Sequence, residues 1–314
     1  MIPVSVVTGF LGAGKTTLLR RVLADPDWAD SAVIVNEFGE VALDHELLAA
    51  SEEVLVNVST GCLCCLVRTD LGTTLMELAR KRAAGEVPAY RRVLVETSGL
   101  ADPAPILHAL MTEALVIETH RLISVVTLVD AVVGTAVLER HPEARRQVML
   151  ADRVLVTKPD LGDAAAAEAA VRGLQAGLAV RAAVRGAVEP EWLFAPGDPV
   201  VPVEAVARHS EGVGSIVIER EAPVAALALT LWMQALAEHA GAKLLRLKGL
   251  VALAEEPMRP MVVHAVQHLV HPPEWLAEWP GGERRTRIVL IGQGIPQHFP
   301  ARLLAAIEAE VAAA

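Results

Sequence analysis

One stretch near the start of the chain has the residue types and spacing of a phosphate-binding loop. Residues 9–16 read GFLGAGKT and satisfy the pattern G-x-x-x-x-G-K-[ST] in full. The glycines let the backbone wrap around phosphates with its N–H groups pointing inward, at the positive end of the following helix. Lys15 would place a charge at the β- and γ-phosphates, and the Thr16 hydroxyl would ligate Mg²⁺. The predicted contacts are Gly9, Gly12, Ala13, Gly14, Lys15, Thr16 and Thr17.

Two short motifs follow in the order expected of a GTPase. ETSG at residues 96–99 ends a predicted strand, where Glu96 could hold Mg²⁺ and Gly99 could offer its N–H to the γ-phosphate. TKPD at residues 157–160 ends a later strand, and Asp160 could accept hydrogen bonds from guanine N1–H and the N2 amine, which adenine cannot offer. The predicted base-binding residues are Thr157, Lys158 and Asp160. GTPases usually have Asn where this chain has Thr157, so the base site departs from the common pattern.

All three cysteines lie within four residues, at Cys62, Cys64 and Cys65, and we expect them in a loop that follows a strand. This spacing suits no disulfide framework and indicates a metal or reactive site in a reducing compartment. Thiolates spaced in this way can hold one soft or borderline cation, such as Zn²⁺ or Co²⁺. The alternative is a structural role, with two cysteines buried and one exposed.

Taken together and in this order, the motifs resemble those of the CobW-like family of metal-handling P-loop GTPases. That family is related to the GTPases that help to load nickel into hydrogenase and urease. The matching segments are GFLGAGKTT, NEFGE, GCLCC, ETSGLADP and TKPD, followed by RLKGLVAL, VVHAVQHLVHPP and RIVLIG. The resemblance implies that GTP binding and hydrolysis are coupled to binding zinc or cobalt and delivering it to a client protein.

The resemblance also implies roles for particular residues. By position, Cys62, Cys64 and Cys65 are the metal ligands, and NEFGE is the first switch, where Glu37 or Glu40 could complete a tetrahedral site or position water. The C-terminal domain would contact the client, and two copies would pair across the nucleotide site. Members often have a glycine where this chain has Ala42, so movement of the switch is in question. Some members carry a His-rich stretch for metal storage, and this chain has none.

The elements that must position these residues alternate between strands and helices. Predicted strands at residues 2–7, 32–35, 54–58, 93–95, 124–129 and 154–156 are apolar on both faces, as in a helix-covered parallel sheet. We therefore expect an α/β doubly wound, mostly parallel P-loop GTPase domain at residues 1–189. Four prolines predict irregular structure in a linker at 190–213.

A smaller α+β domain is expected at residues 214–314. Its predicted strands are 216–218, 243–247, 261–267 and 287–291, and its predicted helices are 223–240 and 300–313. His264 and His268 would share one face of a strand, with His271 close by. We interpret these three residues as satisfied or solvent-facing histidines, with a second metal site as the alternative.

Length and composition limit the class of protein. A chain of 314 residues with 53% hydrophobic residues can bury two cores, which excludes a disordered protein. The net charge of −10 argues against nucleic-acid binding. A bilayer span needs about 20 consecutive apolar residues, and charged residues interrupt every apolar run before it reaches that length. The N-terminus lacks the features of a signal peptide. We expect a cytoplasmic protein with no membrane span.

Three other readings remain open. An ATP-using kinase or ATPase could share the P-loop, and loss of Asp160 would then change little. A metal sensor or storage protein would use nucleotide only to set its conformation. A cobalt GTPase linked to cobalamin biosynthesis would differ in its client and not in its mechanism. Hydrolysis should be slow without a partner, because neither an arginine finger nor a catalytic glutamine can be assigned.

Overall fold

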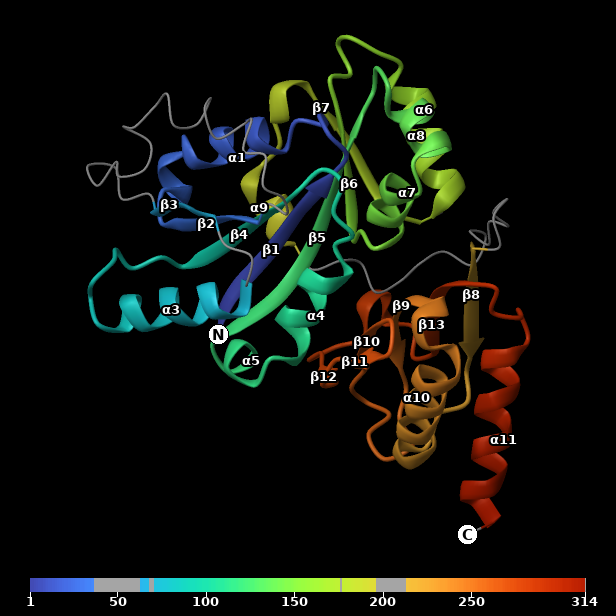
Figure 1. Cartoon of the computed structure of the whole chain (residues 1–314). Helices are drawn as coiled ribbons and strands as arrows, with labels where there is room; N and C mark the ends of the chain where they lie inside the picture. The colour runs from blue at the N-terminus through green and yellow to red at the C-terminus, as the bar shows by residue number, and fades with distance from the viewer. Residues whose placement is uncertain (37–62, 68–70, 176, 196–212, 314) are drawn as a thin grey trace. The chain divides into compact units, whose positions relative to one another are not determined.

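The structure, a computed structural model, describes residues 1–36, 63–67, 71–175, 177–195 and 213–313 (Figure 1). The chain divides into two compact units. The first comprises Met1–Val171 with Leu178–Gly197, and the second comprises Asp198–Ala314 with Arg172–Gly177.

The first unit is built on a seven-stranded parallel sheet (Figure 1). Its strands are β1 (Ile2–Gly9), β2 (Ser31–Asn36), β3 (Leu63–Val67), β4 (Arg92–Thr97), β5 (His120–Asp130), β6 (Arg153–Thr157) and β7 (Ala179–Ala183). Their order is β3-β2-β4-β1-β5-β6-β7, and every pair is parallel. The chain winds to one side of β1 and then to the other, so the predicted doubly wound α/β fold is confirmed.

Helices connect these strands. They are α1 (Lys15–Leu23), α3 (Leu71–Ala83), α4 (Ala104–Thr112), α5 (Ala114–Thr119), α6 (Gly134–Arg140), α7 (Pro142–Met149), α8 (Ala164–Leu174) and α9 (Pro190–Phe194). Short 3-10 turns occur at Pro26–Trp28 and Val184–Gly186. α1 buries Leu18, Leu19 and Val22 in a cluster that also contains Val7 and Leu128 of the central strands. This packing fixes the first turn of α1 above the end of β1.

Five of the six predicted strands of this unit lie in β1, β2, β4, β5 and β6. The sixth, at residues 54–58, lies outside the described residues. β3 and β7 were not predicted. The expectation of irregular structure from residue 190 is wrong for residues 190–194, which form α9 and bury Trp192 and Leu193 in the core of the first unit. Proline is well tolerated in the first turn of a helix, so Pro190 starts α9 and does not prevent it.

The second unit is an antiparallel sheet with two long helices. Its strands are β8 (Val213–Arg220), β9 (Leu244–Val251), β10 (Met261–Val266), β11 (Leu269–Val270), β12 (Glu274–Trp275) and β13 (Thr286–Gln293). The order is β11-β10-β9-β13-β8, with β12 also paired to β10. The helices are α10 (Ala226–Ala240) and α11 (Phe299–Ala313), and 3-10 turns lie at Gly241–Lys243 and Pro280–Gly282. All the predicted elements of this domain are present.

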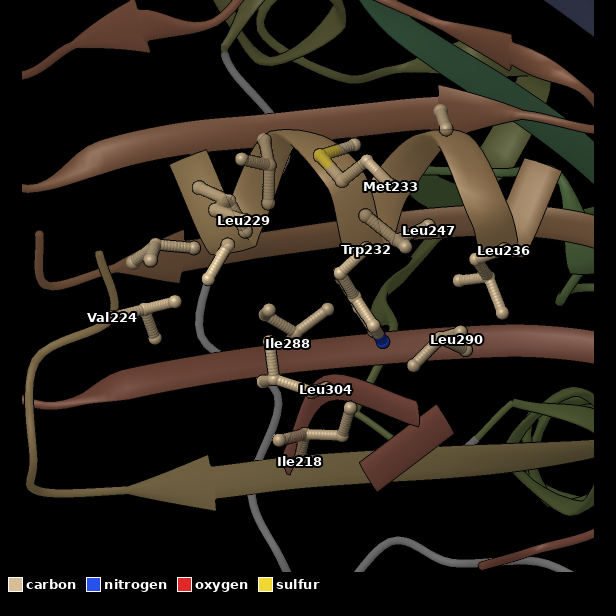
Figure 2. Close-up of a cluster of buried hydrophobic side chains, with 14 of the residues drawn as sticks. Ile218, Val224, Leu229, Trp232, Met233, Leu236, Leu247, Ile288, Leu290 and Leu304 are labelled. Carbon is tan, nitrogen blue, oxygen red and sulfur yellow. The ribbon is translucent and has the colours of Figure 1, made fainter. Parts of the chain in front are cut away.

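A large apolar core packs the two helices of the second unit against its sheet (Figure 2). Trp232 of α10 is fully buried among side chains from the sheet, including Ile288 and Leu290 of β13. Its indole Nε1 donates a hydrogen bond to the carbonyl oxygen of Pro300 in α11, at 2.8 Å. One side chain therefore joins both helices to the sheet.

In the described parts of both units, no helix is both long enough and apolar enough to cross a membrane.

Candidate nucleotide-binding site

The predicted nucleotide-binding residues of the first unit meet at one edge of its sheet. β4, β1, β5 and β6 are neighbours, and all four run in the same direction (Figure 1). Val7 pairs with Glu96, and Asp130 pairs with Thr157, so the polar residues at the ends of these strands lie close in register. Ligands of open α/β sheets bind beyond the carboxyl ends of the strands, beside the point where the strand order reverses.

The loop from β1 to α1 has the backbone geometry that phosphate binding requires. Gly9 has a φ of 140°, and a Cβ there would lie 2.6 Å from the carbonyl oxygen of Leu128. Gly14, with a φ of 95°, is the N-cap of α1. The buried Lys15 folds back over the loop and donates from Nζ to the carbonyl oxygen of Gly9, at 2.9 Å. Gly12 also has positive φ, Ala13 is buried, and Thr16 and Thr17 are exposed in the first turn of α1.

Thr16 and Glu96 form a pair of hard oxygen donors beside this loop. The Thr16 hydroxyl donates to Oε1 of Glu96 at 2.8 Å, although the two residues are 80 positions apart in the chain. Glu96 is only 7% exposed. A hydroxyl and a carboxylate at this spacing fit Mg²⁺, which prefers oxygen ligands and retains several of its waters. The sequence-predicted metal-binding pair is therefore brought together.

Gly99 lies directly against the phosphate loop. A Cβ at this position would be 2.8 Å from the backbone nitrogen of Leu11 and 2.9 Å from its Cα. Only glycine allows the segment after β4 to approach the loop this closely. The predicted position of Gly99 beside the phosphates is consistent with this contact.

The TKPD segment contacts the phosphate loop from the opposite side. The Thr157 hydroxyl donates to the carbonyl oxygen of Ala13 at 2.8 Å, and Lys158 Nζ donates to the carbonyl oxygen of Gly12 at 3.0 Å. Thr157 therefore ties β6 to the loop, which gives a physical reason for Thr at this position. Asp160 is exposed, so its carboxylate is accessible to a nucleotide base.

Lys158 also forms an ion pair with Asp130, which the sequence interpretation missed. Asp130 ends β5, and its Oδ1 accepts a hydrogen bond from the backbone N–H of Val132 at 2.7 Å. The available signal was an acidic residue at the end of an apolar strand, the same signal that identified Glu96. Because no recognised motif surrounds Asp130, that signal went unused.

The cysteine motif does not lie where the sequence analysis expected. Cys64 and Cys65 were predicted in a loop after a strand, but they lie within β3, an edge strand of the sheet. Cys64 pairs with Val33 in the middle of β2, and the register shifts at Cys65. This segment is a strand because it pairs in parallel with β2. The other members of the predicted metal set, Cys62, Glu37 and Glu40, lie outside the described residues.

Two of the three histidines that lie close together in the sequence of the second unit, His264 and His271, are also neighbours in the structure. His271 donates its backbone N–H to the carbonyl oxygen of His264 at 2.8 Å, and the centroids of the two rings are 6.3 Å apart. His268 is exposed at the turn between β10 and β11, beyond the end of β10, so the expectation that it shares one face of a strand with His264 is wrong. Across the described ranges, no group of three or more His, Cys, Asp or Glu side chains is arranged to hold a metal ion.

Comparison with known proteins identifies the class that this fold and site define. Residues 3–184 match the family described as CobW/HypB/UreG, nucleotide-binding domain. Residues 213–309 match the cobalamin synthesis protein cobW C-terminal domain. The chain belongs to the CobW/HypB/UreG family of P-loop GTPases and carries both of these domains.

Two curated relatives extend over nearly the whole chain. The zinc chaperone YjiA of Escherichia coli is 31% identical, over 94% of this chain and 95% of the relative. The zinc chaperone CobW of Pseudomonas aeruginosa is also 31% identical, over 94% and 88% of the two chains. The crystal structure of the Zn(II)-bound YjiA GTPase from E. coli is similar in fold, with a TM-score of 0.73, 30% identity and 98% of each chain covered.

Proposed function

We propose that this chain is a GTP-hydrolysing metallochaperone that binds a divalent transition metal and delivers it to a client protein. The observation that carries the proposal is the convergence of Lys15, the Thr16–Glu96 pair and Lys158 on one loop at the carboxyl edge of the sheet. Membership of the CobW/HypB/UreG family and two zinc-chaperone relatives support it.

In the proposed reaction, this chain's residues stabilise the charge that develops on the γ-phosphate of GTP. Lys15 exchanges its bonds to loop carbonyls for phosphate oxygens, and Gly99 donates its N–H to the γ-phosphate. Thr16 and Glu96 would hold Mg²⁺, which neutralises charge on the phosphates when bound. Hydrolysis by the chain alone should be slow, since no arginine finger can be assigned from the sequence.

Guanine specificity is assigned to Asp160, supported by Lys158 and Thr157. A carboxylate that pairs with guanine N1–H and N2 would be left unpaired against adenine, which gives strong discrimination. In the test, phosphate release is measured from GTP and ATP for wild type, Asp160→Ala and Lys15→Ala. We expect wild type to prefer GTP, Asp160→Ala to lose that preference, and Lys15→Ala to be inactive with both. Equal use of ATP by wild type would instead support the ATPase reading.

The metal cargo is assigned to Cys62, Cys64 and Cys65, with Glu37 or Glu40 as a further ligand. Three thiolates suit Zn²⁺ or Co²⁺, and thiolates persist in the reducing cytoplasm, where we place the protein. GTP would order the segment around Glu37 and raise metal affinity, and hydrolysis would lower it. A metal sensor or storage protein would lack this change in metal affinity. The C-terminal domain is the proposed contact for the client protein.

Pairing of two copies across the nucleotide site is supported by the apolar side chains that surround it. Residues that follow the carboxyl ends of five strands expose large hydrophobic groups: Leu11, Leu100, Val132, Val133, Leu161 and Val184. Apolar groups gathered around a polar site mark a surface for protein contact. Sedimentation velocity with GDP and with a non-hydrolysable GTP analogue tests this. A dimer only with the analogue is expected, and a monomer in both states would contradict it.

A further inference from the structure

The backbone beside Gly99 is held from behind by a glutamine of α7. Gln147 is fully buried, and its Nε2 donates to the carbonyl oxygens of Gly99 and Ala101, each at 3.1 Å. A carboxamide has two N–H donors, and both are used here on carbonyls two residues apart. Only the nitrogen can donate to two carbonyls, so these contacts also fix the orientation of the amide.

α7 is itself fixed to the sheet and to the phosphate loop. The Thr127 hydroxyl of β5 donates to the backbone carbonyl of Gln147 at 2.8 Å. His141 immediately precedes α7, and the centroid of its ring lies 4.5 Å from the centroid of the Phe10 ring in the phosphate loop. Arg146 adds an ion pair to Asp102 at 2.9 Å. The helix therefore spans the loop after β1 and the segment after β4.

One feature of Gln147 indicates more than a structural role. Its Oε1 is buried and accepts no hydrogen bond from the described residues. An unpaired buried acceptor costs about 1–3 kcal/mol, so a residue kept only for stability would be poorly chosen. Such costs are tolerated where a polar group must hold a functional segment in place.

We propose that Gln147 is a positioning residue for GTP hydrolysis. It holds the backbone of residues 99–101 against the phosphate loop, so that the Gly99 N–H meets the γ-phosphate. GDP has no γ-phosphate, so Gln147 affects the bound triphosphate and the hydrolytic step far more than it affects GDP. This inference rests on the proposed function, because it requires Gly99 to contact GTP.

The test compares Gln147→Met, which keeps the length of the side chain and removes both donors, with Val148→Ala. Val148 is a fully buried neighbour in α7 whose truncation lowers stability without touching these hydrogen bonds. We expect Gln147→Met to lower kcat about tenfold to a hundredfold, because small misplacements of a donor have effects of this size. Its Kd for GDP should stay within about twofold of wild type. Val148→Ala should keep the wild-type kcat at a temperature where it is folded.

A second readout does not depend on turnover. Aluminium fluoride added to a fluorescent GDP analogue mimics the γ-phosphate, and Gln147→Met should bind this combination more weakly while binding GDP normally. Wild-type kcat for Gln147→Met, or equal weakening for GDP, would overturn the inference and leave the proposed function intact. A wild type that neither binds nor hydrolyses GTP would overturn the proposed function, and the inference with it.

Discussion

At the scale of single residues, the ion pair between Lys158 and Asp130 explains how the proposed base-binding segment at residues 157–160 is held against the phosphate loop. Asp130 is buried, and it holds the Lys158 ammonium that also bonds to Gly12. Hydrogen bonds to charged groups contribute more than neutral ones, because they are shorter and stronger. The Lys158 side chain should therefore be less well fixed when Asp130 is replaced by an uncharged residue.

Asp130→Asn is expected to weaken GDP and GTP binding alike, by about 1–2 kcal/mol or roughly fivefold to thirtyfold. Isothermal titration calorimetry with each nucleotide measures this. Asp163→Asn is the matched control, because Asp163 caps α8 through the backbone N–H of Ala166 and asparagine caps equally well. If both variants bind nucleotide as wild type does, Asp130 does not position Lys158.

A second prediction at this scale concerns His120, which is buried at the start of β5. Burial, and then the positive charge of Arg82, lower its pKa from 6.5 to about 4. At a pH between these two pKa values, His120 is protonated in the unfolded chain but not in the folded chain. The free energy of unfolding therefore decreases as the pH falls through this range. Across this range the free energy of unfolding of wild type should fall by up to about 1.4 kcal/mol per pH unit more than that of His120→Asn. Urea unfolding from pH 7.5 to 4 measures the difference, and parallel plots of unfolding free energy against pH would contradict a lowered pKa for His120.

At the scale of elements, much of the fold was predictable because apolar runs and motifs coincide. Residues 2–7, apart from Ser5, and residues 93–95 are apolar, as expected of strands covered by helices on both faces, and they lie in β1 and β4. β7 reads AVRAA and α9 reads PEWLF. Neither has the length or periodicity to be recognised locally, and tertiary contacts decide both.

The residues of the candidate site that belong to a sequence motif could be predicted. Those that act as single side chains outside a motif could not. Lys15, Thr16, Glu96 and Lys158 lie at one edge of the sheet, as expected. Gln147 was missed because its proposed role depends on two backbone carbonyls, 48 and 46 residues earlier in the chain, which no local pattern reports. For Cys64 and Cys65, the missing knowledge was the pairing partner of β3.

The joint between α10 and α11 gives a prediction for the second unit. Trp232→Phe keeps an aromatic ring in the core but leaves the carbonyl oxygen of Pro300 without its donor. We expect a loss of about 1–2 kcal/mol in unfolding free energy from the lost hydrogen bond and the small void. Thermal unfolding followed by circular dichroism measures this loss, and GDP affinity should stay unchanged. A variant as stable as wild type would show that the hydrogen bond contributes little.

At the scale of the whole molecule, we expect nucleotide binding and metal binding to be coupled as parts of one equilibrium. If GTP raises metal affinity by some factor, metal must raise GTP affinity by the same factor. A carrier needs this coupling in order to bind metal in one state and release it in the other. A factor of five to 150 corresponds to about 1–3 kcal/mol, the usual range for coupled sites.

The most direct measurement is a Co²⁺ titration of the protein without nucleotide, with Mg-GDP and with a non-hydrolysable Mg-GTP analogue, followed by absorption spectroscopy. Thiolate charge-transfer bands report cysteine ligands directly, and the Cys64→Ser, Cys65→Ser double variant is the control. We expect tighter Co²⁺ binding with the GTP analogue, with thiolate bands that the double variant loses. Equal affinity in all three states, or binding without thiolate bands, would contradict a GTP-gated metal carrier.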